Sequence, residues 1–340
     1  MNQQKEQQLI GESQAILGVL EHASRVAPLN RPVLVIGERG TGKELIAARI
    51  HYLSQRWDRP FVKLNCAALS ESLLESELFG HEAGSFTGAT RRRLGRFELA
   101  HQGSLFLDEL ASTSDRVQEK ILRVIEYGEL ERVGGNETVQ TNVRIIGATN
   151  EDLPAMVEKG KFRADLLDRL AFDVITLPPL RERPDDIMPL AEHFAVKMSG
   201  ELGLKLFSGF SAESRQQLLD YSWPGNVREL KNVVERAVYS MTVQSEPIPS
   251  IVFDPFYSPW RPCEKKAREP TAERSGASPE SPYDFKEHMQ QMEVGLLLSA
   301  LKQCRYNQKK TAEFLGMTYH QLRGYLRKYE LTDSDEPEVD

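Results

Sequence analysis

Short apolar runs alternate with helical patterns over the first half of the chain. Each run is five to eight residues long, which suits a buried strand better than a helix. Strands that are continuously apolar and alternate with helices are typical of a doubly wound parallel sheet, an α/β fold. The predicted strands are residues 33–37, 61–65, 104–109, 143–150 and 172–177.

The pattern changes near residue 180, where helical spacing continues without strands. The sequence "WPGN" (residues 223–226) is a helix-start signal within this helical stretch. The next segment holds eight of the chain's 18 prolines and has no sustained periodicity, which predicts a linker. The predicted divisions are an α/β unit (1–180), a helical unit (181–243), a linker (244–284), a C-terminal helical domain (285–330) and an acidic tail (331–340).

Composition narrows the possible functions. The net charge of −7 gives no general sign of nucleic-acid binding, but residues 305–328 hold six basic residues and one acid. The three cysteines lie far apart without metal-site spacing, which predicts reduced thiols and no zinc. A polar start and the lack of any long apolar run predict a soluble, cytoplasmic protein without a signal peptide or membrane span.

A glycine-rich turn, "GERGTGKE", follows the first predicted strand and opens a helical segment. It fits the phosphate-loop pattern G-x4-G-K, in which backbone N–H groups and a helix N-terminus converge on phosphate oxygens. Lys43 would supply charge for the β- and γ-phosphates, whereas Glu44 replaces the usual magnesium-binding hydroxyl. The alternative is an ordinary strand-to-helix turn. The predicted nucleotide-binding residues here are Gly37, Glu38, Arg39, Gly40, Thr41, Gly42, Lys43 and Glu44.

Polar residues end three further strands, at the sheet edge where this loop would lie. "SLFLDE" ends in Asp108, a candidate ligand of Mg²⁺, and Glu109, a candidate base for the attacking water. Asn65 ends "VKLN" and could hold Glu109 in an inactive position by a side-chain hydrogen bond. Thr149 and Asn150 end "IIGATN" and would lie beside the γ-phosphate. Taken alone, each could be a simple strand cap or turn former.

Three arginines are candidates for phosphate contacts. Arg163 and Arg169 lie in "FRADLLDRL", and an arginine from a neighbouring subunit can stabilise charge on a γ-phosphate. Their spacing does not form one helix stripe, so surface pairing with Asp165 or Asp168 is the alternative. Arg228 in "WPGNVREL" would lie on the first turn of a helix, where it could reach phosphate or remain a surface residue.

The stretch "GSFTGA" places one phenylalanine among small residues. Glycines at both ends give the backbone conformational freedom, which predicts a mobile loop with an apolar ring near its tip. Such a ring needs either a partner or a packed resting position. The loop residues are Gly84, Ser85, Phe86, Thr87, Gly88 and Ala89.

The basic segment near the C-terminus predicts a helix–turn–helix. Asn307 and Thr318 can cap two helices, and Gly316 can make the turn between them. The helix before them has an apolar stripe that suits dimer contacts. The alternative is a basic helical hairpin that binds a protein. The predicted DNA-contacting residues are Lys309, Lys310, Thr318, Tyr319, His320, Arg323 and Arg327.

These motifs, in this order, resemble the AAA+ ATPases and, within them, the bacterial enhancer-binding activators of sigma-54 RNA polymerase. The resemblance covers about residues 8–240 and includes the blocks "GERGTGKELIA", "ELFGHEAGSFTGA" and "YSWPGNVRELKNVVERAV". It implies an AAA+ ATPase subdomain followed by a helical lid. It also implies a protein that binds upstream enhancer DNA, assembles as a homo-oligomeric ring, expected to be a hexamer, and uses ATP hydrolysis to open a closed promoter complex.

The resemblance implies roles for the acids and the residues that sense nucleotide. Lys43 would bind ATP, and Asp108 and Glu109 would serve Mg²⁺ and the attacking water. Asn65 resembles the switch partner of Glu109, and Thr149 resembles sensor I.

Further implied roles concern neighbouring subunits and partners. Arg163 and Arg169 resemble fingers that act in trans, and Arg228 resembles sensor II. The GSFTGA loop would contact sigma-54 through Phe86, although Ser85 stands where this family usually has alanine. In this family, glutamate is normal at the position of Glu44.

The ATPase block begins almost at residue 1, without the receiver or sensory domain that is usual in this family. In this the chain resembles the phage-shock activators, which a peripheral membrane stress protein (PspA-like) inhibits in trans. Trp57 in "SQRWDRP" is the candidate contact for such an inhibitor, and a half-buried packing tryptophan is the alternative. No direct membrane insertion is expected.

Two other classes of function make different predictions. An AAA+ unfoldase that threads polypeptide would have an aromatic pore loop without GSFTGA and no terminal helix–turn–helix. A DNA-binding regulator of sigma-70 promoters with a degenerate ATPase would have lost Asp108, Glu109 or the loop. The sequence has GSFTGA and both acids, which favours the activator.

Overall fold

The computed structural model of the chain describes residues 9–86, 89–204, 206–241, 246–256, 260, 285–304, 306–329 and 331. Contacts divide the chain into two compact units, Met1–Tyr257 and Ser258–Asp340. Thr87 and Gly88 of the predicted loop lie outside the described residues, as do most of the predicted linker and the tail from residue 332. Within the described ranges, no helix is long and apolar enough to cross a membrane.

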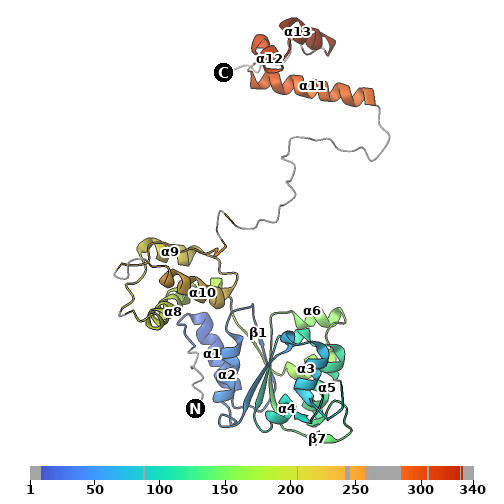
Figure 1. Ribbon diagram of the computed structural model, residues 1–340, viewed down its shortest axis with the longest axis vertical. Helices are drawn as coiled ribbons and strands as arrows, with labels where there is room; N and C mark the ends of the chain where they lie inside the picture. The colour runs from blue at the N-terminus through green and yellow to red at the C-terminus, as the bar shows by residue number, and fades with distance from the viewer. Residues whose placement is uncertain are drawn as a thin grey trace. The chain divides into compact units, whose positions relative to one another are not determined.

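A five-stranded parallel sheet forms the centre of the first unit (Figure 1). Its strand order is β2-β5-β8-β1-β9, and every neighbouring pair runs parallel. This arrangement confirms the predicted α/β fold with a doubly wound sheet. The strands are β1 Val33–Ile36, β2 Phe61–Asn65, β5 Ser104–Asp108, β8 Arg144–Thr149 and β9 Val174–Thr176.

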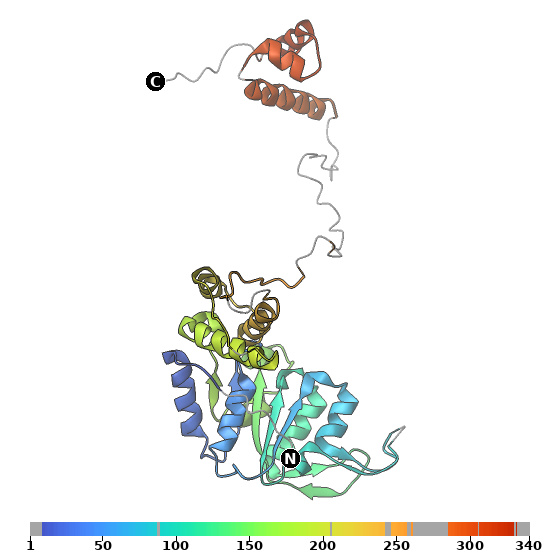
Figure 2. The ribbon, with the colours of Figure 1, turned by 60° about the vertical axis from the view of Figure 1, so that its left-hand side comes forward.

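Helices cover both faces of this sheet (Figures 1 and 2). On one face, residues such as Ile16 and Ile46 of α1 and α2 form a core, and on the other Ile121 and Leu166 of α5 and α7 form a second core. Because it has a core on each side, β8 is buried along its whole length, which explains its continuous apolar run. The helices are α1 Gln14–Val26, α2 Lys43–Tyr52, α3 Glu71–Phe79, α4 Arg96–Leu99, α5 Asp115–Tyr127, α6 Leu153–Glu158 and α7 Ala164–Leu170, with short 3₁₀ turns η1 Cys66–Ala68 and η2 Leu110–Ser112.

Two small antiparallel hairpins lie beside the sheet and were not predicted. Their strands are two or three residues long, too short to produce a readable alternation. They are joined by backbone bonds from Val133 N to Gly80 O (2.9 Å) and from Glu82 N to Val133 O (3.1 Å). The GSFTGA loop therefore rises from a hydrogen-bonded base. The strands are β3 Gly80–His81 with β4 Arg93–Leu94, and β6 Glu129–Glu131 with β7 Thr138–Gln140.

The helical subdomain follows the sheet and has its own core. Trp223 is fully buried at its centre, and its indole Nε1 donates to Leu218 O at 2.9 Å. The helix that "WPGN" announces begins at Asn226, as predicted. The elements are η3 Leu180–Glu182, η4 Pro184–Asp186, α8 Ile187–Glu201, α9 Ala212–Asp220 and α10 Asn226–Tyr239.

Residues 246–256 belong to the packed surface of the helical subdomain, although they fall within the predicted linker. The Phe253 ring stacks on Tyr221 with 4.2 Å between centroids, and Ile248 and Ile251 are buried. The packed apolar residues of this extended segment do not recur at a helical or strand period. Its packing therefore could not be predicted from the sequence pattern.

The second unit contains three helices around one small core. Leu297, Leu301, Ala312, Leu322 and Leu326 are buried in it. The two predicted caps form, because the Asn307 side chain accepts from Lys310 N (3.2 Å) and the Thr318 hydroxyl accepts from Gln321 N (3.3 Å). The helices are α11 Phe285–Gln303, α12 Gln308–Phe314 and α13 Tyr319–Lys328.

Candidate functional site

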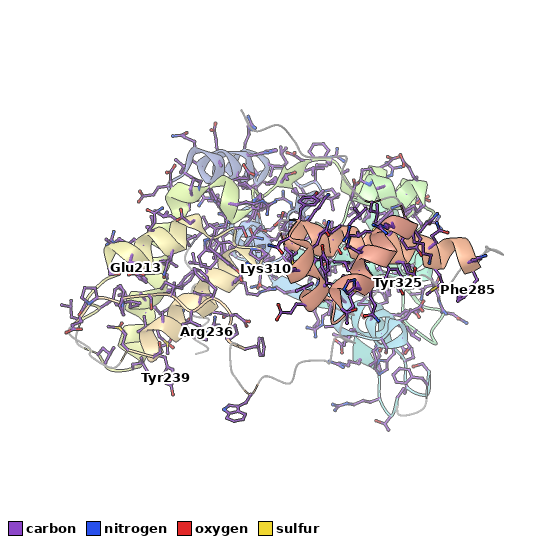
Figure 3. All side chains as sticks on the ribbon, turned by 90° about the horizontal axis from the view of Figure 1, so that it is seen from above. Glu213, Arg236, Tyr239, Phe285, Lys310 and Tyr325 are labelled. Atoms are coloured by element: carbon purple, nitrogen blue, oxygen red, sulfur yellow. The ribbon has the colours of Figure 1, made fainter. Side chains whose placement is uncertain are left out.

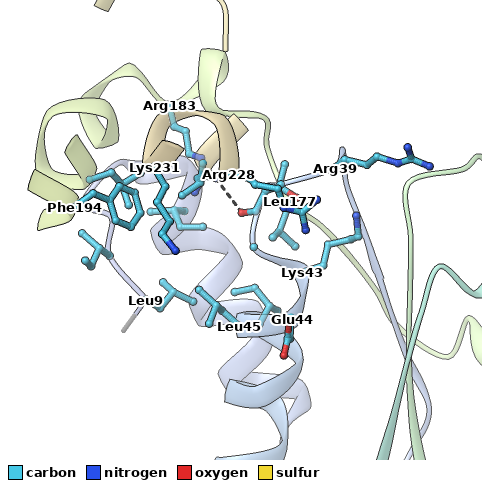
Figure 4. Close-up of a pocket in the computed structure, with 18 of the residues that line it drawn as sticks. Leu9, Arg39, Lys43, Glu44, Leu45, Leu177, Arg183, Phe194, Arg228 and Lys231 are labelled. Carbon is cyan, nitrogen blue, oxygen red and sulfur yellow. Dashed lines mark hydrogen bonds between the residues drawn. The ribbon is translucent and has the colours of Figure 1, made fainter. Parts of the chain in front are cut away.

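The predicted phosphate loop lies between the end of β1 and the start of α2 (Figure 4). Helix α2 begins at Lys43, so its N-terminal N–H groups belong to the loop. The Lys43 amine donates to Gly37 O at 2.8 Å and to Glu38 O at 3.2 Å. Burial lowers the pKa of Lys43, while the nearby carboxylates of Glu109 and Asp108 act to raise it. The loop thus holds a partly desolvated cation among backbone donors, an arrangement suited to phosphate.

A cavity of about 340 Å³ lies beside this loop (Figure 4). Its polar part contains residues 39–44 together with Asp108, Glu109 and Arg228. Its other part is mostly apolar and combines α1, α2 and the helical subdomain. This shape of lining suits a ligand with an anionic end and a flat apolar end. The apolar lining residues are Leu9, Ile10, Ile16, Leu45, Ile46, Leu177, Leu190, Phe194 and Val227.

The two acids that end β5 stand at the polar end of the cavity. Glu109 has a left-handed backbone (φ 52°), a conformation that is sparsely populated for residues other than glycine. Its N–H donates to Asp108 Oδ1 at 3.0 Å, and its Oε1 lies 3.8 Å from Arg39 Nε. The turn therefore directs two neighbouring carboxylates into the same cavity. Such a pair provides the oxygen ligands that Mg²⁺ prefers.

Asn65 contacts Asp108 rather than Glu109. Its Nδ2 donates to Asp108 Oδ2 at 3.5 Å, and its Oδ1 accepts from Ala67 N at 2.9 Å. The predicted contact with Glu109 is not formed, because the amide oxygen of Asn65 caps η1 and the left-handed turn leaves Glu109 beside Arg39. Asn65 and Asp108 are also register partners on neighbouring strands.

The polar end of β8 lies next to the phosphate loop. Gly37 N donates to Thr149 O at 3.2 Å, which fixes the two segments together. The buried Thr149 hydroxyl accepts from Glu151 N at 3.0 Å. The Asn150 amide donates to Glu151 Oε1 at 3.1 Å, while its buried oxygen has no hydrogen-bond partner among the described residues. An unsatisfied buried oxygen beside the loop is a position for a ligand or water to fill.

Arg163 and Arg169 do not line the cavity. Arg163 Nη2 pairs with Asp165 Oδ2 at 2.8 Å, which is one of the two pairings weighed from the sequence. Arg169 Nε pairs with Glu126 Oε1 at 2.9 Å, a partner that the sequence did not indicate. Within this chain the two arginines are therefore separate from the phosphate loop.

Arg228 does line the cavity, from the first turn of α10. The turn packs directly on the phosphate loop: a Cβ placed on Gly40 would lie 2.3 Å from Gly225 O and 3.0 Å from Arg228 Cβ. Arg183 Nη2 also donates to Thr41 O at 3.1 Å. The helical subdomain thus brings the cations Arg183 and Arg228 to the phosphate loop (Figure 4).

The described residues of the GSFTGA loop, 84–86 and 89, are hydrogen-bonded to one another. Gly84 N donates to Ala89 O at 2.7 Å, and Ala89 N donates to Phe86 O at 3.0 Å. The Phe86 ring rests edge-on against His81, with 5.0 Å between centroids, yet 43% of the residue stays exposed. The ring is thus neither free nor buried. The buried Ser85 hydroxyl has no partner among the described residues and sits against Gly134.

A buried arginine ties the base of this loop to α4 and to the second hairpin. Arg132 donates to Glu98 at 3.0 and 2.5 Å and to Glu82 Oε1 at 3.1 Å, and its side chain is only 3% exposed. Glu137 Oε2 lies 3.4 Å away on the β6–β7 connection. These charge-assisted bonds raise the pKa of Arg132, chiefly through Glu98. One cation therefore joins α4, the start of the loop and the second hairpin.

The predicted DNA surface lies on the second unit. His320 and Arg323 are exposed on α13, and Tyr319 is half-buried at its start. The side chains of Lys309, Lys310 (Figure 3) and Arg327 are also exposed. Leu326 rather than Tyr325 packs inward, with 1% against 38% exposure, so the hydrophobic side of α13 faces α11 and α12 and the basic side faces solvent. Thr318 caps α13, as described above.

Trp57 is exposed in the loop before β2, with 64% of its surface accessible. Trp57 is therefore not the half-buried packing residue that was the alternative. An exposed tryptophan is a common feature of protein contact sites.

Comparison with known families accounts for most of the chain. Residues 9–176 match the sigma-54 interaction domain, residues 181–251 the AAA+ ATPase lid domain, and residues 289–329 the Fis family of bacterial regulatory proteins. The Psp operon transcriptional activator of Escherichia coli (strain K12) is 58% identical over 95% of this chain and 98% of its own length. The chain belongs to the sigma-54-dependent activators. The Nif-specific regulatory protein of Azotobacter vinelandii is 55% identical over 68% of this chain and 44% of its own length.

Solved structures agree with this assignment. NtrX from Brucella abortus in complex with ATP is 33% identical, with a TM-score of 0.66 over 95% of this chain and 70% of that chain. NtrX in complex with ADP matches to the same extent. The sigma-54-dependent activator described here is accordingly an ATP-binding AAA+ ATPase with a helix–turn–helix DNA-binding domain. A threading unfoldase and a sigma-70 regulator with a degenerate ATPase are not supported.

Sequence reasoning missed several charged contacts of this activator. Arg132 and Glu98 are 34 residues apart, and Asn226 and Glu38, whose side chains are hydrogen-bonded, are 188 apart. No local pattern records such pairs. Asn226 does have a local signal, since it is the last residue of "WPGN", but that pattern indicates only a helix start and not a contact with Glu38.

Proposed function

We propose that this sigma-54-dependent activator hydrolyses Mg²⁺-ATP at the cavity beside the phosphate loop and uses the energy to open closed promoter complexes. The carrying observation is that Lys43, the neighbouring acids Asp108 and Glu109, and Arg228 line one cavity although they come from three separate segments. The apolar part of the cavity would receive the adenine, and the loop would receive the phosphates.

The acids would divide the work of hydrolysis. Asp108 would hold Mg²⁺, which neutralises phosphate charge when bound, and Glu109 would orient and deprotonate the attacking water. Support comes from the carboxylates' common position at the end of β5. Asn65 would restrain this pair in the resting state through its bond to Asp108 rather than to Glu109.

Other residues would respond to the γ-phosphate. Thr149 and Asn150 would act as sensors because the end of β8 is bonded to the phosphate loop, and because the Asn150 oxygen has no hydrogen-bond partner in the described part of the chain. Arg228 would contact phosphate from the helical subdomain. Hydrolysis would then alter contacts on both sides of the cavity at once.

Arg163 and Arg169 would complete the site of a neighbouring subunit in a ring, expected to be a hexamer. Both lie outside their own cavity, which is compatible with action in trans. Their pairs with Asp165 and Glu126 would have to exchange for phosphate contacts during assembly. Exposed pairs of this kind are weak, so the exchange is energetically accessible.

The GSFTGA loop would contact sigma-54 through Phe86. Phe86 is 43% exposed and its ring rests edge-on against His81, so it can leave His81 with little loss of stability. The Arg132 cluster would transmit movement from the ATPase core to the loop base because it bonds α4 to the residues on which the loop stands.

The second unit would bind upstream enhancer DNA. Tyr319, His320 and Arg323 would face base edges, and Lys309, Lys310 and Arg327 would contact phosphates, with Thr318 at the start of the recognition helix. Exposed apolar residues recur at heptad-like spacing on α11 and would pair two copies on a palindromic site: Phe285, Met289, Met292 and Leu296.

Arg323→Ala is expected to weaken binding to the preferred DNA site by about 10- to 100-fold and to relax sequence discrimination at one position. Lys309→Ala should instead weaken all duplexes alike and reduce the salt slope of binding by about one. Both can be measured by fluorescence anisotropy on a duplex selected from a random library, at several salt concentrations. Identical behaviour of the two variants would contradict the division between base and phosphate contacts.

We further propose that this activator serves a phage-shock operon in the cytoplasm. The support is the 58% identity with the Psp operon activator over nearly its whole length. An inhibitory peripheral membrane stress protein (PspA-like) would bind at Trp57, whose ring is available to a partner. Such control in trans requires no membrane insertion by the activator itself.

The test of the function is co-purification with sigma-54 in different nucleotide states. With ADP–aluminium fluoride, which imitates the transferring phosphate, we expect a stable complex; with ADP alone or without nucleotide, we expect none. Lys43→Ala should lose the complex in every state because it removes the loop's cation. A complex of equal strength in all states would separate sigma-54 binding from ATP hydrolysis and refute the proposed coupling.

A further inference from the structure

Three side chains join the helical subdomain to the phosphate loop. The Glu38 carboxylate accepts two bonds from Arg181, with Nη2 to Oε1 at 2.6 Å and Nη1 to Oε2 at 3.0 Å. It also accepts from Asn226 Nδ2 at 3.1 Å. Glu38 lies in the loop, Arg181 in the connection that follows the sheet, and Asn226 at the start of α10. We call these three residues the latch.

Asn226 is the buried member of the latch. It is 0% exposed, and its oxygen accepts from Leu180 N at 2.7 Å while its Nδ2 also donates to Arg39 O at 3.1 Å. Its backbone is left-handed (φ 53°), a conformation that asparagine tolerates better than most residues. One amide thus bonds the phosphate loop, the connection and the first turn of α10.

The latch determines where Arg228 stands. Arg228 is two residues beyond Asn226 on the same turn, and that turn is in van der Waals contact with Gly40. If Asn226 and Arg181 were released, Arg183 would be the remaining charged side chain that is hydrogen-bonded to the loop from the helical subdomain among the described residues, through its bond to Thr41 O. The position of Arg228 relative to bound phosphate therefore depends on these bonds.

Charge gives Arg181 a second effect. Glu38 is an anion inside a loop whose ligand is a polyanion, and such a like charge opposes binding. The hydrogen bonds from Arg181, followed by that from Asn226, lower the pKa of Glu38 to about 2, so the carboxylate is ionised at neutral pH. Arg181 compensates this charge through two bonds at the loop itself.

We propose that Glu38, Arg181 and Asn226 are positioning residues for the ATPase reaction: they hold Arg228 over the phosphates, and Arg181 screens the Glu38 charge from ATP. None of the three needs to touch the reacting atoms. The inference rests on the proposed ATP site.

The decisive experiment is a charge cycle in the full-length chain. Arg181→Gln leaves Glu38 uncompensated and is expected to raise the KM for ATP about tenfold, with a smaller change in kcat. In Glu38→Gln/Arg181→Gln the uncompensated charge is gone, and two amides can still hydrogen-bond. The KM of this double variant should fall to within about threefold of the wild-type value.

The comparison isolates the effect of charge, because Arg181→Gln and the double variant differ only in whether residue 38 is a carboxylate or an amide. A KM for the double variant equal to or above that of Arg181→Gln would therefore overturn the proposal, as would an unchanged KM in Arg181→Gln. Arg215→Gln is the matched control, since Arg215 forms an exposed pair with Glu192 at 3.3 Å on the same subdomain and does not line the cavity. It should leave KM unchanged.

The role of Asn226 is tested separately, through kcat. Asn226→Ala should lower kcat more than the two charge variants, because it frees the turn that carries Arg228. Thermal unfolding of each variant checks folding, and if Asn226→Ala does not fold, the charge cycle still decides the proposal. The wild-type chain is measured in the same assay. If it does not hydrolyse ATP, the proposed ATP site is wrong; if it does and the variants behave like it, only the role of the latch is wrong.

Discussion

Glu109→Gln is expected to keep ATP binding and to lose hydrolysis by about 10²- to 10⁴-fold, the usual contribution of a positioned general base. Glutamine preserves the size of the side chain and removes its ability to accept a proton. The Glu109 carboxylate enters the cavity from a strained left-handed position beside Asp108, and Arg39 lies 3.8 Å away. Removal of one negative charge at the phosphate end should not weaken ATP binding.

Two measurements check this result: the equilibrium affinity for an ATP analogue and the steady-state release of phosphate. Glu213→Gln is the matched control, because Glu213 is exposed on α9 and does not line the cavity. Its turnover should equal that of the wild type. Normal turnover in Glu109→Gln would remove Glu109 from the role of general base and would direct attention to another group at the cavity.

Phe86→Ala is expected to leave ATP hydrolysis intact and to abolish the complex with sigma-54. Aromatic anchors at the centre of an interface commonly contribute more than about 2 kcal/mol, or over thirtyfold in affinity. The ring contacts His81 rather than the nucleotide cavity, so its loss should not disturb Lys43 or the acids. This variant should therefore hydrolyse ATP normally but fail to bind sigma-54.

The comparison needs phosphate release and sigma-54 capture with ADP–aluminium fluoride on the same preparation. Phe172→Ala serves as the control, because Phe172 is 52% exposed just before β9 and is not part of the loop. It should capture sigma-54 normally. If Phe86→Ala also captured sigma-54 normally, the contact would have to lie in other residues of the loop or elsewhere on the ring.

Elements whose signal is local could be predicted from the sequence. The five central strands, the phosphate loop and the two helix caps of the second unit each depend on residues within one short window. A strand buried on both faces must be continuously apolar, and a loop that binds phosphate must be rich in glycine. Both requirements apply to residues that are neighbours in the chain, so both elements can be predicted from a short stretch of sequence.

Contacts between distant segments could not be predicted in the same way. Asn65 was expected to contact Glu109, but only the three-dimensional turn at Glu109 decides which carboxylate it meets. The Arg132 cluster and the latch join charges that have no fixed spacing in the chain. Residues 246–256 carry apolar anchors without a period, and so they resembled a linker.

The contact between Gly40 and the start of α10 has a consequence for how the phosphate-loop motif is interpreted. Glycine in this motif is usually attributed to the needs of the phosphate alone. Here a methyl group at residue 40 would collide with Gly225 O at 2.3 Å, before any ligand is bound. Even an alanine at this position would force the start of α10 away from the phosphate loop. The absence of a side chain at Gly40 therefore lets the phosphate loop and the start of α10 pack in direct contact, so this glycine serves the junction between the two subdomains as well as the phosphate.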